Sequence, residues 1–68
     1  MSMDRATHQR FLEYRERHEY FGGSQPILSN TEFVAADAEH DELEAKGEAR
    51  DDEEEVRFAD LAALLFRD

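Results

Sequence analysis

Glycine-containing breaks at two places divide the chain into three stretches whose apolar residues recur at helical spacing. Gly22 and Gly23 supply the left-handed stop that commonly ends a helix, and Pro26 follows shortly afterwards. Gly47 marks the second break. The pattern therefore predicts an all-α protein, a small bundle of about three helices that span residues 3–21, 30–46 and 52–67, with a loop at 22–29 and a linker at 47–51.

Helix-start signals support two of these boundaries. Ser29 and Glu32 have the spacing of a capping box, in which each side chain satisfies the other residue's unpaired backbone N–H. Asp52 and Glu55 repeat that spacing before the third stretch, where carboxylates also suit the positive end of a helix. We expect the second helix to begin near residue 30 and the third near residue 52.

The third stretch is apolar around much of its circumference. Between Val56 and Phe66 it is interrupted only by Arg57 and Asp60. One small bundle cannot easily bury two apolar faces of a single helix, so this pattern predicts contact with a second copy or with a partner groove. The predicted partner-binding residues are the large apolar ones: Phe58, Leu61, Leu64, Leu65 and Phe66.

The small size of the chain also predicts association with a second copy or a partner. The chain has 68 residues, enough for a single domain over residues 1–68 with a thin core, and it contains no cysteine. Neither disulfides nor thiolate metal sites can therefore stabilise the chain. We expect the bundle to be completed by oligomerisation, most simply as a homo-oligomer, or by a protein partner.

Charge is distributed unevenly. Residues 1–23 carry four acidic residues and four arginines, so the net charge of −10 belongs to the rest of the chain. Such a field repels phosphates, and we expect no direct binding of nucleic acid; a basic protein surface is the natural partner. One lysine against seven arginines, beside 18 acidic residues, is typical of GC-rich genomes and of halophilic proteins.

No stretch of about 18 apolar residues exists, and the N-terminus lacks the basic-then-apolar pattern of a secretory signal. We expect a protein that is soluble and cytoplasmic, without contact to a membrane. Catalysis is not expected either, because a chain this small has little room for the pocket that would shift the pKa of a carboxylate. The sequence contains no glycine-rich phosphate loop and indicates no cofactor.

A metal site is the sharpest chemical alternative. If the first two helices pack antiparallel, His8 falls beside the later part of the second helix, where His40 and Glu44 lie with Asp37 and Asp41 at three- and four-residue spacing. Histidine with carboxylates holds zinc and similar divalent ions. The competing interpretation is that the acidic face is merely solvated and that His40 packs within an apolar stripe.

These patterns leave several functions open. The first is a small acidic, non-enzymatic interaction module, an adaptor or regulatory subunit that docks through its C-terminal helix. The second is an acidic inhibitor that imitates nucleic acid and occupies the basic groove of a DNA- or RNA-binding protein. The third is the metal-binding protein. In a fourth, only residues 1–23 and 56–68 are ordered until a partner binds the acidic middle.

Overall fold

The computed structural model describes residues 4–67, and within them the chain is helical without any β-strand. Helix α1 spans Arg5–Phe21, α2 spans Asn30–Lys46 and α3 spans Asp52–Leu64, while a 3-10 turn, η1, occupies Gly47–Ala49. The predicted all-α class and the three helices are confirmed. Met3, where the first helix was expected to begin, lies outside the described residues.

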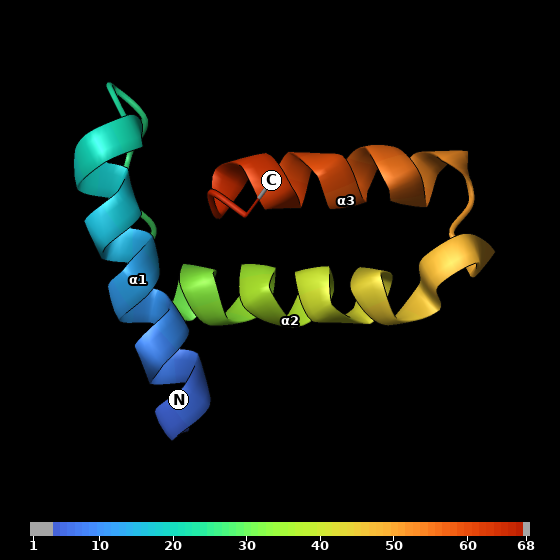
Figure 1. Ribbon diagram of the computed structural model, residues 1–68, viewed down its shortest axis with the longest axis horizontal. Coiled ribbons are helices and arrows are strands. Elements are labelled where there is room, and N and C mark those ends of the chain that lie inside the picture. Colours follow the sequence, from blue (N-terminus) through green and yellow to red (C-terminus); the bar gives the residue numbers. More distant parts are fainter. Residues whose placement is uncertain (1–3, 68) are drawn as a thin grey trace.

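Helices α2 and α3 run antiparallel side by side, and α1 crosses the end of this pair where α2 begins and α3 stops (Figure 1). We refer to α2, η1 and α3 together as the hairpin. The Cα atoms extend over 32 × 28 × 15 Å. The shortest of these extents is about half of each of the other two, so the three helices form a flat molecule.

Phe33 of α2 stands at the centre of the core and is fully buried. Its ring centroid lies 5.1 Å from that of Phe11 and 5.4 Å from that of Tyr14, both on α1. Aromatic packing of this kind therefore attaches α1 to the hairpin. The buried apolar cluster as a whole contains Phe11, Tyr14, Phe33, Ala36, Leu43, Leu61 and Leu65.

The loop before α2 is tied to α1 on one side and open on the other. The backbone N–H of Leu28 donates to the Tyr14 hydroxyl at 3.0 Å, and the Leu28 side chain packs against the core. Ile27, the residue before it, is exposed. The predicted capping box of Ser29 and Glu32 is present with both of its hydrogen bonds, and α2 begins directly after it.

Two glycines are required by their local geometry. A Cβ on Gly22 would lie 2.6 Å from the backbone oxygen of His18, so this position admits no side chain. Gly22 itself stays right-handed, and the left-handed residue after α1 is Gly23. Gly47 has a positive φ of 54° where α2 ends and η1 begins, as expected of a helix terminator.

The capping box of the third helix lies one residue earlier than predicted. The box consists of Asp51 and Glu54, not Asp52 and Glu55, and both of its hydrogen bonds are formed. Consecutive acidic residues offer the same spacing in two registers, and sequence alone does not separate them. Asp51 adopts the extended backbone of an N-cap, with φ −82° and ψ −179°.

Helix α3 ends at Leu64, whereas the sequence predicted helix as far as residue 67. The backbone N–H of Phe66 donates to the carbonyl of Ala63, and that of Arg67 donates to the carbonyl of Ala62. These are the two hydrogen bonds of a Schellman turn, which reverses the chain after a helix. The turn directs Arg67 back towards α2.

Phe66 occupies the left-handed position of this turn, with φ 57°, where glycine is usual. For a side chain of this size the conformation costs about 1–2 kcal/mol. Its ring centroid lies 5.7 Å from that of Tyr14 and 6.1 Å from that of His18. Packing against α1 offsets the strain and holds the turn in place.

Candidate functional site

The predicted partner-binding residues belong mainly to the core of the chain itself. Leu61 and Leu65 are fully buried, and Phe58, Leu64 and Phe66 pack against the same cluster. As expected, the bundle does not bury both apolar faces of this helix. The face that carries Leu61 and Leu65 is covered by α2 and α1, whereas Val56, Ala59 and Ala63 on the other face are exposed.

The residues predicted to hold a metal are not brought together. His8 and Glu44 are exposed, whereas His40 is buried. The prediction assumed antiparallel first and second helices, but α1 crosses α2 near its start, far from the later turns of α2 (Figure 1). Within residues 4–67 no group of three histidine or carboxylate side chains has the geometry to hold a metal ion.

A partly buried cluster of polar and charged side chains joins α1, α2 and the turn after α3. We call Arg10, Asp37, His40 and Arg67 the charged cluster. Asp37 is 3% exposed. It accepts hydrogen bonds from Nε and Nη2 of Arg10 at 3.0 and 2.8 Å and from Nη2 of Arg67 at 2.5 Å. Two arginines from opposite ends of the chain are thus fixed to one carboxylate.

Burial and the two arginines shift the pKa of Asp37 in opposite directions. Burial by itself raises the pKa, because it disfavours the charged form, but the hydrogen bonds and positive charges of Arg10 and Arg67 outweigh it and hold the pKa below its usual value. Asp37 is therefore a structural anion. A general acid would need a raised pKa instead.

His40 is the second buried polar residue of this cluster, and it is 5% exposed. Its Nδ1 lies 3.3 Å from Nη1 of Arg67. A guanidinium donates and has no lone pair to offer, so Nδ1 is the acceptor and the neutral ring carries its proton on Nε2. On its other side the imidazole stacks on Phe58, with ring centroids 4.9 Å apart.

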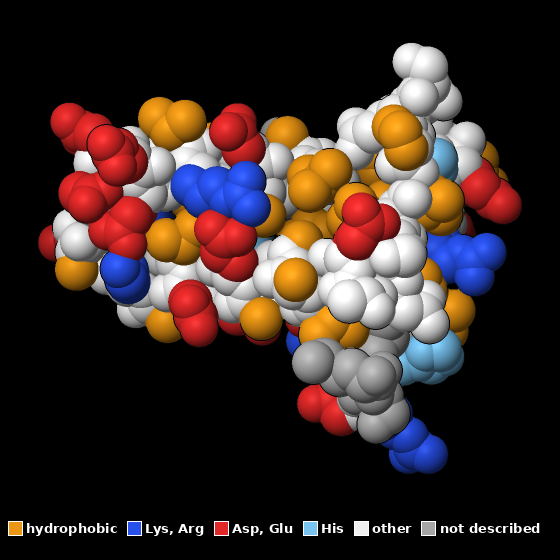
Figure 2. Space-filling view, turned by 180° about the vertical axis from the view of Figure 1, so that it is seen from behind, with side chains coloured by type: hydrophobic (Ala, Val, Ile, Leu, Met, Phe, Trp, Pro, Cys, Tyr) orange, Lys and Arg blue, Asp and Glu red, His pale blue; other side chains and the backbone are white. Residues whose placement is uncertain are grey.

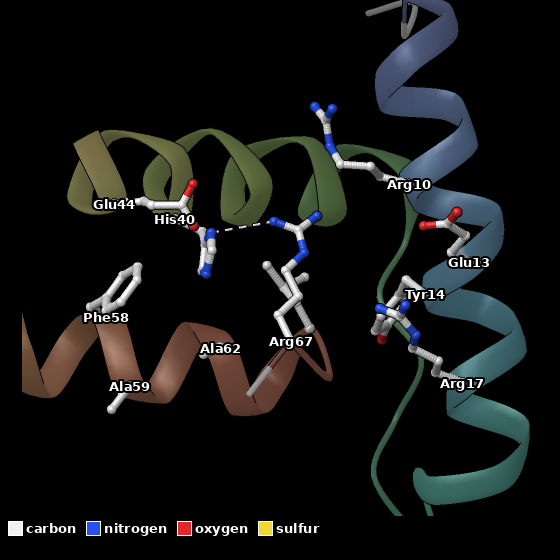
Figure 3. A pocket seen from close by; sticks show the side chains of 11 residues that line it. Arg10, Glu13, Tyr14, Arg17, His40, Glu44, Phe58, Ala59, Ala62 and Arg67 are labelled. Carbon is white, nitrogen blue, oxygen red and sulfur yellow. Dashed lines mark hydrogen bonds between the residues drawn. The ribbon is translucent and has the colours of Figure 1, made fainter.

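The charged cluster borders a cleft of about 610 Å³ where the three helices meet (Figure 3). Helix α1 contributes Arg10, Glu13, Tyr14 and Arg17 to its lining, and α2 contributes His40 and Glu44. The opposite wall is formed by α3 and the turn that follows it, with Phe58, Ala59, Ala62, Leu65 and Arg67. Hence three of the seven arginines of this acidic chain line one cleft.

Sequence reasoning missed this arrangement for identifiable reasons. Asp37 was counted with the solvated acidic face of its helix, and nothing in the pattern marks it as buried. Arg67 was expected to lie in the last turn of a helix that runs to residue 67, whereas the Schellman turn brings it to Asp37. Only the i, i+3 spacing of Asp37 and His40 signalled that both could lie on one face.

A separate surface exposes large apolar side chains. Within residues 4–67 five such side chains are clearly exposed, and four of them belong to α1 or the loop after it: Leu12, Tyr20, Phe21 and Ile27. We call these four residues the α1 surface. Tyr20 and Phe21 are 76% and 73% exposed, and their ring centroids lie 6.3 Å apart.

Acidic side chains gather at the opposite end of the hairpin, where α2 is joined to α3 (Figure 2). Some of these carboxylates form ion pairs within the hairpin. Glu39 forms a bidentate ion pair with Arg57, Glu55 pairs with Arg50, and Glu54 pairs with Lys46 while it also caps α3. The acidic end is therefore stabilised by ion pairs, and it also carries carboxylates that form no ion pair within residues 4–67.

Comparison of the chain with family models, curated proteins and solved structures returns no significant match. Within the described part of the chain no helix has both the length and the apolar character needed to cross a membrane.

Proposed function

We propose that this protein is a non-enzymatic interaction module that pairs with a second copy of itself through the α1 surface and presents its acidic hairpin to a protein partner. The observation that carries the proposal is the exposure of Tyr20 and Phe21, about three quarters of each side chain, at the end of α1. Aromatic residues are enriched at the centres of protein interfaces, because they bury a large apolar area with little loss of conformational freedom.

Charge favours a second copy at this surface. Residues 4–21 hold four arginines and four acidic residues, so α1 with its N-cap is neutral, while the remainder carries the net charge of −10. Two copies that met through their hairpins would bring like charges together. Contact through α1 keeps the acidic ends apart, and screening beyond about 8–10 Å at ordinary salt removes most of the remaining repulsion.

The composition of α1 supports such a contact. Arg15, Glu16 and Glu19 line a shallow groove with Leu12 and Ile27, so both signs of charge lie beside the apolar residues. A two-fold contact places the same patch on both subunits, and a patch that carries both signs can pair with itself. Self-association would also add apolar burial to a chain whose own core is thin.

The acidic end of the hairpin is the surface we assign to a protein partner. Its carboxylates without an ion pair within residues 4–67 include Glu48, Asp52 and Glu53, which are exposed. A basic protein surface complements this field and would approach faster at low salt. Imitation of nucleic acid receives less support, because ion pairs with Lys46, Arg50 and Arg57 interrupt the row of negative charges such a mimic needs.

Sedimentation equilibrium of the full chain tests the self-pairing. We expect a dimer whose Kd changes little with salt, and a Tyr20→Ser, Phe21→Ser double variant that weakens it by about a hundredfold, since a central aromatic residue contributes about 1–2 kcal/mol or more. Val56→Ser is the matched control, because Val56 is an exposed apolar residue on the hairpin. A monomeric wild-type chain, or an equal loss in the control, would contradict the proposal.

A further inference from the structure

A groove of about 480 Å³ lies between the loop before α2 and the end of α3, and we call it the loop groove. Its apolar lining comes from both sides, with Pro26 and Leu28 on the loop and Ala63 and Leu64 on α3. Pro26 and Ala63 are exposed, so the groove is open to a ligand. Its volume falls within the range of about 300–1,000 Å³ that is usual for binding pockets.

The charged side chains that line the loop groove are both acidic. Glu32 belongs to the first turn of α2 and Asp60 to α3, and both are exposed. Asp60 forms no ion pair within residues 4–67. Glu32 uses only Oε1 to accept the backbone N–H of Ser29, and this hydrogen bond holds the pKa of Glu32 below its usual value. Both carboxylates are therefore ionised at neutral pH and can still pair with a cation.

This charge distinguishes the loop groove from the cleft between the three helices and from the groove on α1. The cleft is lined by three arginines and the groove on α1 by Arg15, so their carboxylates have positive charges close by. Within residues 4–67 no arginine or lysine lines the loop groove. On a chain with a net charge of −10, such a groove repels anions and attracts cations.

An unpaired polar atom also lies at this groove. Gln25 is one of the lining residues, and its Nε2 is buried without a hydrogen-bond partner within residues 4–67. A buried donor in this state is destabilising. Because Nε2 has no hydrogen bond to lose, rotation of the side chain towards an acceptor in the groove would be favourable. A polypeptide backbone brings such acceptors in its carbonyl groups.

We infer that the loop groove binds a segment of a protein partner that carries arginine or lysine next to a large apolar side chain. The apolar side chain lies against Leu28 and Ala63. The cation pairs with Asp60 or Glu32, and a backbone carbonyl accepts from Nε2 of Gln25. A second copy of the chain is disfavoured as the occupant, because it carries the same negative charge. The lining residues belong neither to the α1 surface nor to the acidic end of the hairpin, so this site is additional to both.

NMR titration of the isotope-labelled full chain with the dipeptide N-acetyl-Phe-Arg amide tests the site. We expect saturable shifts of the backbone amides of Leu28, Ala63 and Leu64 and of the side-chain amide of Gln25. N-acetyl-Phe-citrulline amide, which carries a neutral urea of the same shape, should bind about fivefold more weakly at low salt and equally at high salt. Absence of shifts at these residues, or equal binding of the two dipeptides at low salt, would overturn the proposal.

Variants of the lining locate the binding. Asp60→Asn combined with Glu32→Gln should weaken the arginine dipeptide by about the same fivefold, and glutamine can still complete the capping box. Ala63→Leu should abolish binding by filling the groove; Ala63 is exposed, so the fold should persist, as circular dichroism can verify. Asp52→Asn combined with Glu53→Gln is the matched control, since it removes the same charge from the start of α3. An equal loss in this control would show that the dipeptide responds only to overall charge, contrary to a defined site.

Two further measurements identify the class of occupant. Phenethylguanidine has the ring and the guanidinium without a peptide carbonyl, and it should bind more weakly than the arginine dipeptide; equal or tighter binding would overturn the assignment of a polypeptide. In sedimentation equilibrium, Ala63→Leu should leave self-association unchanged, and a weakened dimer would show that a second copy fills the groove instead of another protein. The titration can be read on a monomeric chain, so failure of the pairing through α1 and failure of this proposal are distinguishable.

Discussion

Helix α1 and the hairpin differ in charge and in what holds them. Residues 4–21 balance four arginines against four acidic residues, whereas the rest of the chain carries the net charge of −10. The hairpin is braced by ion pairs such as that of Arg57 with Glu39, in addition to its buried leucines. Helix α1 is attached mainly through the rings of Phe11 and Tyr14 and through one buried polar contact, Arg10 with Asp37.

The difference shows how a chain with excess acid can still fold. Where like charges are dense, exposed pairs and caps place the carboxylates beside arginines, lysine or helix N-termini, which lowers repulsion at little cost in desolvation. Where the chain is neutral, aromatic burial provides the attachment and leaves apolar surface exposed. The following predictions separate these two kinds of stabilisation, from the largest expected effect to the smallest.

Phe33→Ala should break the connection between the two regions. Phe33 is fully buried and contacts the rings of Phe11 and Tyr14 on α1, so its truncation should cost about 3–5 kcal/mol. In so small a protein this is enough to unfold most of the population at room temperature. Urea denaturation followed by circular dichroism measures the loss, and Val56→Ala, which truncates an exposed apolar side chain of the hairpin, serves as the control. Similar losses in the two variants would show that α1 is not held by this cluster.

Asp37→Asn should be the next largest change. It removes the anion that receives Arg10 and Arg67, and we expect a loss of about 2 kcal/mol near neutral pH, since both arginines keep partial access to water. The variant should loosen the turn after α3, which amide hydrogen exchange of residues 65–67 would detect. Unchanged exchange there would indicate that Arg67 does not hold the turn.

A low pH should reproduce part of the effect of Asp37→Asn. The folded-state pKa of Asp37 is lowered, so its contribution to the free energy of unfolding is complete above the ordinary carboxyl pKa of about 3.9 and is lost as the pH falls through the folded-state value. The difference in stability between the wild type and Asp37→Asn should therefore shrink as the pH is lowered below about 4. A difference that stays constant with pH would mean that the charge of Asp37 is not what stabilises the fold.

Phe66→Gly and Phe66→Ala together measure the strain in the turn. Both variants lose the packing of the ring against Tyr14 and His18, but glycine also relieves the left-handed backbone. The glycine variant should therefore be the more stable of the two by about 1 kcal/mol, as judged by thermal or urea unfolding. Equal stabilities would argue that the turn is not left-handed in solution.

Glu39→Gln should give the smallest effect. The carboxylate is exposed, and its bidentate pair with Arg57 lies on the surface of the hairpin, where water and salt weaken it. We expect a small decrease in the melting temperature at low salt that disappears at high salt. A decrease as large as that of Asp37→Asn would show that surface ion pairs, not burial, dominate the hairpin.

The sequence by itself determined where the helices lie. Glycine and the Ser29–Glu32 box act within a few residues of themselves, so α2 was predicted at its observed bounds. The start of α3 was also predicted, and only its capping box lies one residue earlier than expected. Local hydrogen bonds and backbone preferences do not depend on distant parts of the chain. They can be read in any short window of the sequence.

Tertiary structure decided which faces are covered and what the cleft contains. Nothing near Asp37 in the sequence indicates that Arg10 and Arg67, 27 and 30 residues away, neutralise it. The crossing of α1 over the start of α2, and the turn at Phe66 that it supports, depend on aromatic packing between distant segments. For the same reason Leu61 and Leu65 belong to the core, since burial is set by the neighbours that the fold supplies.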